Sequence, residues 1–438
     1  MIEGLARGVR ELASSLGDPW RPGDPPDSPS PEDAYRGCLE GGRRYRLVVS
    51  CRSPRGRGEG PLSGVPLAYK DNMDYPGEPT RCGSRAVFST PRAPARAVAL
   101  LESMGAVPVA RASMDEMGLS TTGYNTVHGT AVNPLDPSRI VGGSTSGGAG
   151  LVALWGGGLA VGTDAGGSVR IPAAFTGLYS LRLRRGDASL EGVAVVSRTM
   201  ESLGVIAATP EVAALAVQAL APGEALRAGV LVAAWESGAW SPVVVVPRGY
   251  EALASPEVRD AFEDALSTLE SRGVRVEWVE WGALWRLDRA RAVITLSEAY
   301  QALASRLGQA PEGLRRILEE ASRIPAWLYS EALALIGEAR ERAASILGGR
   351  LLALPTTPIP PPPREEAERL AYSRKLIAYT GIANALDLSS ATIPLQKRLE
   401  RIPASIMLSS TDTAAALASM VVLSRELAGG SKGAWAGG

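Results

Sequence analysis

Lysine is rare in this chain, and one lysine stands apart from the others. Four of the 46 basic residues are lysine, and Lys70 is the only lysine before Lys375. Arginine supplies the cations elsewhere, but a guanidinium cannot give up its proton in a protein. A site that needs a cation able to become a neutral base has to use lysine. Lys70 is therefore either a candidate base or an incidental surface charge in an arginine-rich chain.

Two serines lie in glycine-rich turns 24 residues apart. The stretch from Gly142 to Gly167 holds eleven glycines among 26 residues, which indicates unusual backbone dihedrals or very close packing. Ser144 lies in the first turn, and Ser168 lies in the second, which opens into a predicted helix with Pro172 in its first turn. Ser168 is thus expected at a helix N-terminus. There, a free backbone N–H group can stabilise an oxyanion by ~3 kcal/mol.

The same turns could instead form a phosphate cradle or serve a purely structural purpose. Neither G-x-x-x-x-G-K-[ST] nor G-x-G-x-x-G occurs in them, which argues against a nucleotide phosphate site. Neither serine lies in G-x-S-x-G, which excludes the nucleophile elbow of the α/β-hydrolases. A serine nucleophile at a substrate carbonyl fits the pattern better.

Such a serine is a weak nucleophile until a base accepts its proton. His128 is the only histidine, and it lies in a Thr- and Asn-rich turn, where a structural, hydrogen-bonded role is the simpler interpretation. Lys70 follows the apolar run VPLAY, so burial can lower its pKa from ~10.4 toward ~7 to 8. The residues favour Lys70 and leave His128 as the alternative.

Three segments match one protein family in the right order. GVPLAYKDN, GGSTSGG and VGTDAGGSVRIPAAFTG, all between residues 61 and 183, resemble the amidase signature family. The resemblance implies that Ser168 is the acyl-forming nucleophile, that Ser144 relays its proton, and that Lys70 is the final base. It also implies an α/β amidase-signature fold, in which a large mixed β-sheet is covered by helices on both faces.

The resemblance further implies the groups that support this Ser-Ser-Lys triad. The peptide bond between Gly143 and Ser144 would be cis. Asp164 and Arg170 would brace the turn that carries the nucleophile. The oxyanion donors would be the backbone N–H groups of Ala165, Gly166, Gly167 and Ser168.

Other segments resemble one group within this family. ARASMDEMGLSTTGYNTVHG, LRRIL and LLALPTTP are similar to the A subunits of glutamyl-tRNA(Gln)/aspartyl-tRNA(Asn) amidotransferases, although the acidic pair in MDE could equally cap a helix. This implies hydrolysis of glutamine. The ammonia would pass to a tRNA-binding partner subunit that holds ATP and Mg and converts Glu-tRNA(Gln) or Asp-tRNA(Asn) to the amide. No cofactor is expected in this chain.

The glutamine pocket itself departs from this group. Arg315 or Arg316 could bind the glutamine carboxylate, but Ile377 stands where these subunits have an acidic residue shortly before the position of Thr380. The group that would hold the glutamine amino group is therefore missing. A stand-alone amidase for small or aryl amides and a non-catalytic assembly subunit both stay open as alternatives.

Composition limits the class of protein. The 438 residues carry a formal net charge of zero, so the chain lacks the basic excess typical of direct nucleic-acid binding. Cys38, Cys51 and Cys82 are too few and too irregularly spaced to predict a disulfide framework, and with one histidine they predict no metal site. The start of the chain lacks a signal-peptide pattern, and no long apolar run occurs, so we expect a cytoplasmic protein.

The pattern along the chain, together with the family resemblance, implies one amidase-signature domain over residues 1–430, followed by a flexible tail at 431–438. Apolar runs of strand length alternate with helical segments in the part that holds the triad, which is typical of an α/β core. The expected parts are a lead-in with a short helix at 1–60, the core at 61–210, a sheet continuation with a helical cap at 211–350, and a return to the core at 351–430.

Overall fold

The computed structural model describes residues 28–56, 58–367, 370–399 and 402–428. The helix expected near the start of the chain and the expected tail at 431–438 lie outside these residues. In the described part, eleven strands form one sheet: β1 (Val48–Cys51), β2 (Pro66–Lys70), β3 (Val107–Ala112), β4 (Leu159–Asp164), β5 (Tyr179–Arg182), β6 (Ser202–Ala207), β7 (Val243–Pro247), β8 (Arg275–Val279), β9 (Leu351–Pro355), β10 (Ser389–Leu399) and β11 (Ile402–Ser410).

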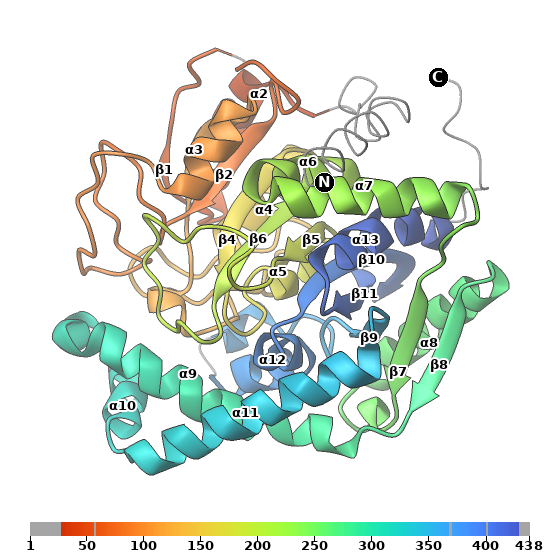
Figure 1. Ribbon diagram of the computed structural model, residues 1–438. Helices are drawn as coiled ribbons and strands as arrows, with labels where there is room; N and C mark the ends of the chain where they lie inside the picture. Colours follow the sequence, from red (N-terminus) through yellow and green to blue (C-terminus); the bar gives the residue numbers. More distant parts are fainter. Residues whose placement is uncertain (1–27, 57, 368–369, 400–401, 429–438) are drawn as a thin grey trace, which may run out of the picture.

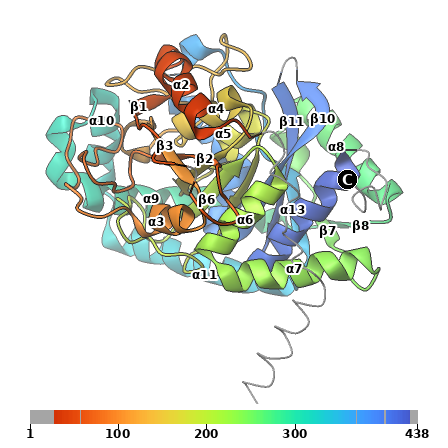
Figure 2. The ribbon, with the colours of Figure 1, turned by 90° about the horizontal axis from the view of Figure 1, so that it is seen from above.

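The strand order in the sheet is β1-β3-β2-β4-β6-β5-β10-β11-β9-β7-β8. Strand β2 pairs in parallel with β3 and β4, and β7 pairs in parallel with β8 and β9, whereas the pairs between these two groups are antiparallel. The sheet is therefore mixed, as expected. Figure 2 shows β1 at one end of the molecule and β7 and β8 at the other.

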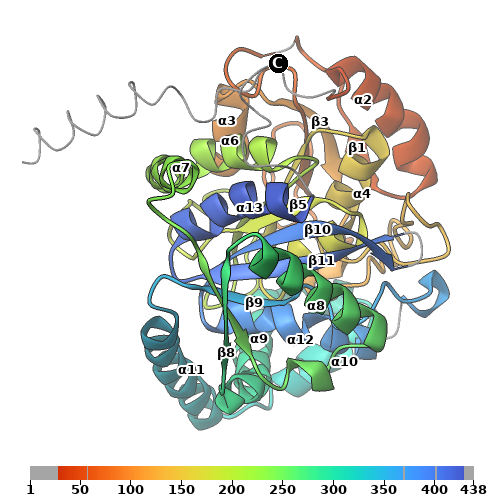
Figure 3. The same ribbon diagram turned by 90° about the vertical axis from the view of Figure 1, so that its right-hand side faces the viewer.

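Helices cover both faces of this sheet, which confirms the predicted fold class. The α-helices of the described part are α2 (Pro31–Gly37), α3 (Arg96–Ser103), α4 (Ser146–Trp155), α5 (Arg170–Phe175), α6 (Pro210–Leu220), α7 (Pro222–Glu236), α8 (Pro256–Ser271), α9 (Leu287–Leu303), α10 (Glu312–Ala321), α11 (Ala326–Leu347), α12 (Leu370–Ala385) and α13 (Thr413–Leu427). In Figure 3, strands β9 to β11 lie between the layer of α6, α7 and α13 and the layer of α9, α11 and α12.

The two-residue repeat of the strands explains why both faces are covered. Leu67 and Tyr69 of β2 belong to a large apolar cluster that they share with α3, α6 and α13. Ala68, between them, faces the opposite side and packs in a second cluster with α4 and α5. A strand that is apolar on both faces must be buried on both. Helices α4 and α5, which pack on the Ala68 face of β2, follow Ser144 and Ser168 in the chain. Packing on this face of the sheet therefore also positions the two serine turns.

Residues 211–350 extend the sheet and add a separate helical layer. Strands β7 and β8 continue the sheet beyond β9, and helix α8 packs on these strands. Helices α10 and α11 pack on α9, which in turn packs on α12. Figure 1 shows α9, α10 and α11 along the lower edge of the molecule, away from α6 and α7. Helix α12 thus lies between this layer and the core.

One feature of the lead-in segment corrects the sequence analysis. Cys38 and Cys51 form a disulfide, with their Cα atoms 6.0 Å apart. Cys38 begins a π-helical turn, Cys38–Gly42, which packs beside β1, where Cys51 is the last residue. The spacing of 13 residues could not reveal this approach, because it depends on how the turn folds back onto the edge strand. Cys82 is a free, buried cysteine.

Candidate active site

Lys70 is the last residue of β2, and its side chain is almost completely buried, with 2% exposed. Its Nζ donates hydrogen bonds to Ser144 Oγ at 2.8 Å and to the Oγ1 and carbonyl oxygen of Thr163 at 3.1 Å each. Thr163 lies on the neighbouring strand β4 and is itself held by Asn72, whose Nδ2 donates to Thr163 Oγ1 at 3.0 Å. The parallel pairing of β2 with β4 therefore brings the amine to Thr163, and its hydrogen bond to Ser144 links it to the first serine turn.

The surroundings of this amine favour its neutral form. Burial lowers the pKa of Lys70, and the negative charges of Glu201, Asp115 and Asp164 oppose this shift only in part. In the described part of the chain, Nζ makes its hydrogen bonds to hydroxyl and carbonyl oxygens and not to a carboxylate. A lysine without a direct ion pair can exchange its proton more readily than a salt-bridged one, which is the property that a general base needs.

Ser144 lies two residues before the start of α4, and the peptide bond between Gly143 and Ser144 is cis, as the family resemblance implies. Asp115 packs against this bond so closely that a Cβ on Gly143 would collide with Asp115 Oδ1. The Asp115 carboxylate accepts the N–H groups of Thr122 and Gly123 at 3.0 Å each. Burial raises the pKa of Asp115 to about 6. The acidic pair of MDE thus holds loops in place, because Glu116 likewise accepts from the Thr126 hydroxyl at 2.9 Å.

Ser168 lies in the turn between β4 and α5 and is 4% exposed. Its carbonyl oxygen accepts the N–H of Thr145 at 3.0 Å, which joins the two serine turns through the backbone. The hydroxyls of Ser144 and Ser168 line the same cavity but are not hydrogen-bonded to each other among the described contacts. A path from Ser168 to Lys70 therefore needs the two serine hydroxyls to approach each other when substrate binds.

The oxyanion donors differ from the expected set at one position. The N–H of Gly167 donates to Asp164 Oδ1 at 2.8 Å, so it is not free to bind a substrate oxygen. This corrects the assignment of Gly167 as a donor, and the reason is that the Asp164 side chain folds back under the turn. The N–H groups of Ala165, Gly166 and Ser168 make no hydrogen bond within the described residues. These three groups remain available to an oxyanion.

Gly167 has a different, structural reason to be glycine. Its φ is +130°, and a Cβ there would collide with Thr380 Oγ1 on α12. The Thr380 hydroxyl donates to the carbonyl oxygen of Gly166 at 2.6 Å. A side chain at position 167 would separate α12 from the turn that carries Ser168, the expected nucleophile (the nucleophile turn). The glycine therefore lets α12 pack against this turn and hold it in place.

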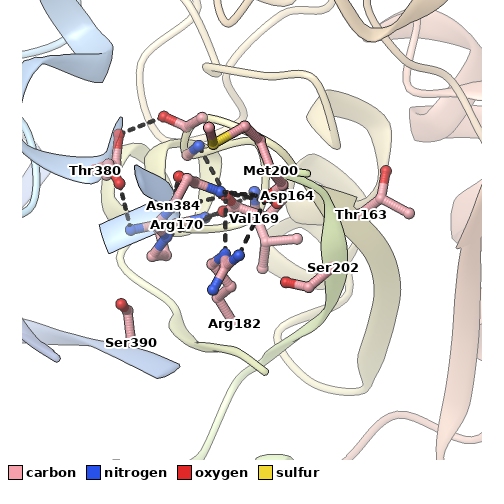
Figure 4. A network of polar contacts seen from close by, with 12 residues as sticks. Thr163, Asp164, Val169, Arg170, Arg182, Met200, Ser202, Thr380, Asn384 and Ser390 are labelled. Atoms are coloured by element: carbon pink, nitrogen blue, oxygen red, sulfur yellow. Dashed lines mark hydrogen bonds and ion pairs between the residues drawn. The ribbon is translucent and has the colours of Figure 1, made fainter. Parts of the chain in front are cut away.

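Figure 4 shows the polar network beneath this turn, with Asp164 and Arg170 at its centre. The Arg170 guanidinium donates to the Asp164 carboxylate through Nε at 3.0 Å and Nη2 at 2.7 Å. Asn384 of α12 binds both partners, since it accepts from Arg170 Nη2 at 2.6 Å and donates to Asp164 Oδ1 at 3.0 Å. Arg182 lies 3.8 Å from the same carboxylate. Burial alone would raise the pKa of Asp164, but the two arginines hold it well below its usual range.

The three triad residues line one small, partly open pocket. Its wall contains residues that the sequence analysis did not single out: Asn72, Cys82, Met114, Met117, Gly118, Ala194, Val196 and Glu201. Glu201 is 4% exposed, and one carboxylate oxygen accepts the N–H of Val196 at 2.9 Å. The sequence offered no sign of its role, because Glu201 directly precedes β6, which reaches the site only through antiparallel pairing with β4.

The structure does not bring the other sequence candidates to this cavity. Arg315 and Arg316 lie on α10, where they pair with Glu319 and Glu312 of the same helix on an exposed surface. Their side chains are 43% and 72% exposed. His128 is half-buried and does not line the cavity. Ile377 of α12 does lie near the nucleophile turn, because a Cβ on Gly166 would be 3.7 Å from its Cγ2.

No group of three or more His, Cys, Asp or Glu side chains in the described part of the chain is arranged to hold a metal ion. Likewise, none of the helices described is both long enough and apolar enough to span a membrane.

Comparison with known proteins identifies the class to which this site belongs. The amidase family model matches residues 49–414, so the chain belongs to the amidase family, whose members hydrolyse C–N bonds. A solved structure described as an amidase superposes with a TM-score of 0.79 at 26% identity and covers 97% of this chain and 99% of that one. The family resemblance of the three motif segments is thereby confirmed.

The curated relatives point to one group within this family. The chain is 31% identical to the A subunit of glutamyl-tRNA(Gln) amidotransferase from Natronomonas pharaonis over 382 residues, which is 77% of this chain and 88% of the relative. It is 28% identical to the protein of the same name from Haloarcula marismortui, over 80% of this chain and 91% of the relative. The structure of the Thermotoga maritima protein shares the fold, with a TM-score of 0.76 at 22% identity and 90% of each chain covered.

Proposed function

We propose that this chain is the glutamine-hydrolysing A subunit of a tRNA-dependent amidotransferase. The observation that carries the proposal is the buried Lys70–Ser144 contact of 2.8 Å in a pocket that Ser168 also lines, within a chain similar to such subunits over most of their length. The ammonia would pass to a tRNA-binding partner subunit that uses ATP and Mg, which would place the protein in the cytoplasm.

The geometry supports a sequence of proton transfers for this reaction. Ser168 Oγ attacks the carboxamide carbon, and its proton passes to Ser144 while the proton of Ser144 passes to the neutral Lys70 amine. The oxyanion that forms is met by the free N–H groups of Ala165, Gly166 and Ser168. The protonated path then donates to the leaving nitrogen, so ammonia departs and an acyl-enzyme remains. Water attacks this ester with the same base and releases the acid.

Ammonia release separates this proposal from its alternatives. The purified chain, alone and with a tRNA-binding, ATP-using partner, is supplied with glutamine, and ammonia and amidated tRNA are measured. We expect ammonia from glutamine, and amidated tRNA when the partner is present. Ser168→Ala abolishes both, whereas Ser189→Ala, at an exposed serine, changes neither. Amidated tRNA formed from glutamine by a complex containing Ser168→Ala would instead make this chain a non-catalytic assembly subunit.

A stand-alone amidase is the second candidate, and one observation favours it. Ile377 places an apolar side chain beside Gly166, where the amidotransferase subunits are expected to have an acidic group for the glutamine amino group. A pocket of this kind suits a neutral amide. Faster hydrolysis of small neutral amides than of glutamine by the isolated chain, with no gain when a partner is added, would decide for this candidate.

A further inference from the structure

Arg291 is a buried cation close to the nucleophile turn. It contacts neither the triad nor the Asp164–Arg170 pair that supports this turn in the described part of the chain. It lies on α9, and its side chain is 6% exposed. Helix α9 packs against α12, the helix that also holds the nucleophile turn through Thr380 and Asn384, and Figures 1 and 3 show the two helices side by side. A buried guanidinium needs partners for its five N–H donors, because leaving them unmet costs free energy.

Most of those donors have no hydrogen-bond partner among the described residues. Nη2 of Arg291 donates to Asp288 Oδ1 at 2.7 Å, and this is its only hydrogen bond in the described part of the chain. Nε is buried without a partner. By contrast, the Arg170 guanidinium is bound by Asp164, Asn384 and the carbonyl oxygen of Thr380. The charge of Arg291 is thus paired with Asp288, but its remaining N–H donors are left for solvent or a ligand.

Nη1 of Arg291 lies beside the turn that carries Ser168, outside the residues that line the triad pocket. A Cβ placed on Gly166 would lie 3.7 Å from Arg291 Nη1 and 3.7 Å from Ile377 Cγ2. Gly381 on α12 makes this position possible, since a Cβ there would be 2.8 Å from Arg291 Nε. Gly166 is one of the three residues with a free N–H beside Ser168. The guanidinium and the oxyanion site therefore border the same glycine.

We propose that Arg291 binds the carboxylate of the amide substrate and selects acidic amides, in the role for which the sequence suggested Arg315 or Arg316. The inference rests on the proposed function. In glutamine the carboxylate is separated from the carboxamide carbon by two methylene groups and Cα. This short spacer suits a cation bordering Gly166. Ile377, beside the same glycine, offers an apolar wall to the methylene groups. A carboxylate placed there would give Nη1 a charge-assisted hydrogen bond.

This arrangement selects for a carboxylate more strongly than for an amino group. The carboxylate meets Arg291, whereas Ile377 offers the substrate nothing to hold a charged nitrogen. The expected substrates are thus monoamides of short dicarboxylic acids, among which glutamine is one member. Glutaramate, which has the same chain length without the amino group, should be hydrolysed well. Butyramide, which lacks the carboxylate, should be a poor substrate.

The test compares these three amides in matched variants. Arg291→Met should lower kcat/KM for glutamine and glutaramate about 100-fold, mainly through a higher KM, since a charge pair is lost. The kcat/KM for butyramide should stay within about twofold, which also shows that the variant is folded. Arg291→Lys should recover part of the loss. Arg289→Met, at an exposed arginine of the same helix, is the control and should change none of the three values.

Each possible result decides for or against this role of Arg291. An equal loss for all three amides in Arg291→Met, or no loss for glutaramate, would overturn it. Wild-type protein that hydrolyses butyramide as well as glutaramate would overturn it too, while glutamine hydrolysis could still stand. Wild-type protein that hydrolyses glutaramate but not glutamine would refute the proposed function and support the carboxylate site.

Discussion

Two buried cations of the core, Arg170 and Lys70, are held in contrasting ways. Arg170 forms a two-point ion pair with Asp164, and Asn384 binds both partners. Among the described residues, Lys70 donates its hydrogen bonds to hydroxyl and carbonyl oxygens, and burial lowers its pKa. The first cation is permanent and neutralised in place, so it can support a turn. The second is left without a direct counter-ion, so it can lose its proton and act on a substrate.

Replacing Lys70 should give the largest effect on activity. Lys70→Arg keeps the positive charge but cannot supply a neutral base, so we expect it to lower kcat for amide hydrolysis by about 10⁴-fold, as much as Lys70→Ala. Ammonia release measured at several pH values tests this, with circular dichroism to establish that the variants are folded. An arginine variant with a tenth of wild-type activity would show that charge alone suffices at this position.

Breaking the ion pair should mainly affect stability. Asp164→Asn removes the charge that neutralises Arg170 and leaves a buried cation without its counter-ion, which costs ~3–5 kcal/mol of unfolding free energy. Urea unfolding measures the loss. Glu319→Gln, in an exposed pair with Arg315, is the control and should cost less than about 1 kcal/mol. Equal stability of the two variants would mean that the buried pair contributes no more than a surface one.

Glu201 allows the basicity of Lys70 to be changed without touching the amine. Its negative charge raises the Lys70 pKa against the larger effect of burial. Glu201→Gln removes that charge, so the Lys70 pKa should fall further, and the neutral base should then persist at lower pH. The acid limb of the profile of kcat against pH should therefore move to lower pH. A limb that stays in place or moves to higher pH contradicts this assignment, and Glu280→Gln, at an exposed glutamate, serves as the control.

The smallest effect is expected at the single histidine. Burial lowers the pKa of His128, and its side chain does not line the cavity of the triad. His128→Ala should thus keep kcat for amide hydrolysis within about twofold of wild type. A near-complete loss in a folded variant would return the base to the histidine and remove the contrast between Lys70 and Arg170.

The catalytic half of the site could be predicted from short segments of the sequence. Lys70 ends a buried strand, and Ser144 and Ser168 lie in glycine turns next to their own helices, so their positions follow from local pattern. The apolar run VPLAY and the helix predicted after Ser168 appear in β2 and α5.

The recognition half could not be predicted in this way. Whether Arg291 or Arg315 faces the nucleophile turn depends on how α9 packs against α12, and helical periodicity does not specify a partner helix.

Two further features outside substrate recognition could not be predicted either. The N–H of Gly167 is taken by Asp164 because of a side-chain rotamer that the sequence does not show. The disulfide between Cys38 and Cys51 likewise depends on a contact between two segments of the fold.

The clamp between α12 and the nucleophile turn has a consequence for synthesis of the protein. Asn384 follows Arg170 by 214 residues, and both it and Thr380 hold the turn in which Ser168 lies. At 5–20 residues per second a ribosome needs ~10–40 s to travel that distance. The nascent chain therefore carries its nucleophile long before the helix that fixes it exists. Until α12 has been made, an unfinished chain lacks the contacts that fix the turn of Ser168.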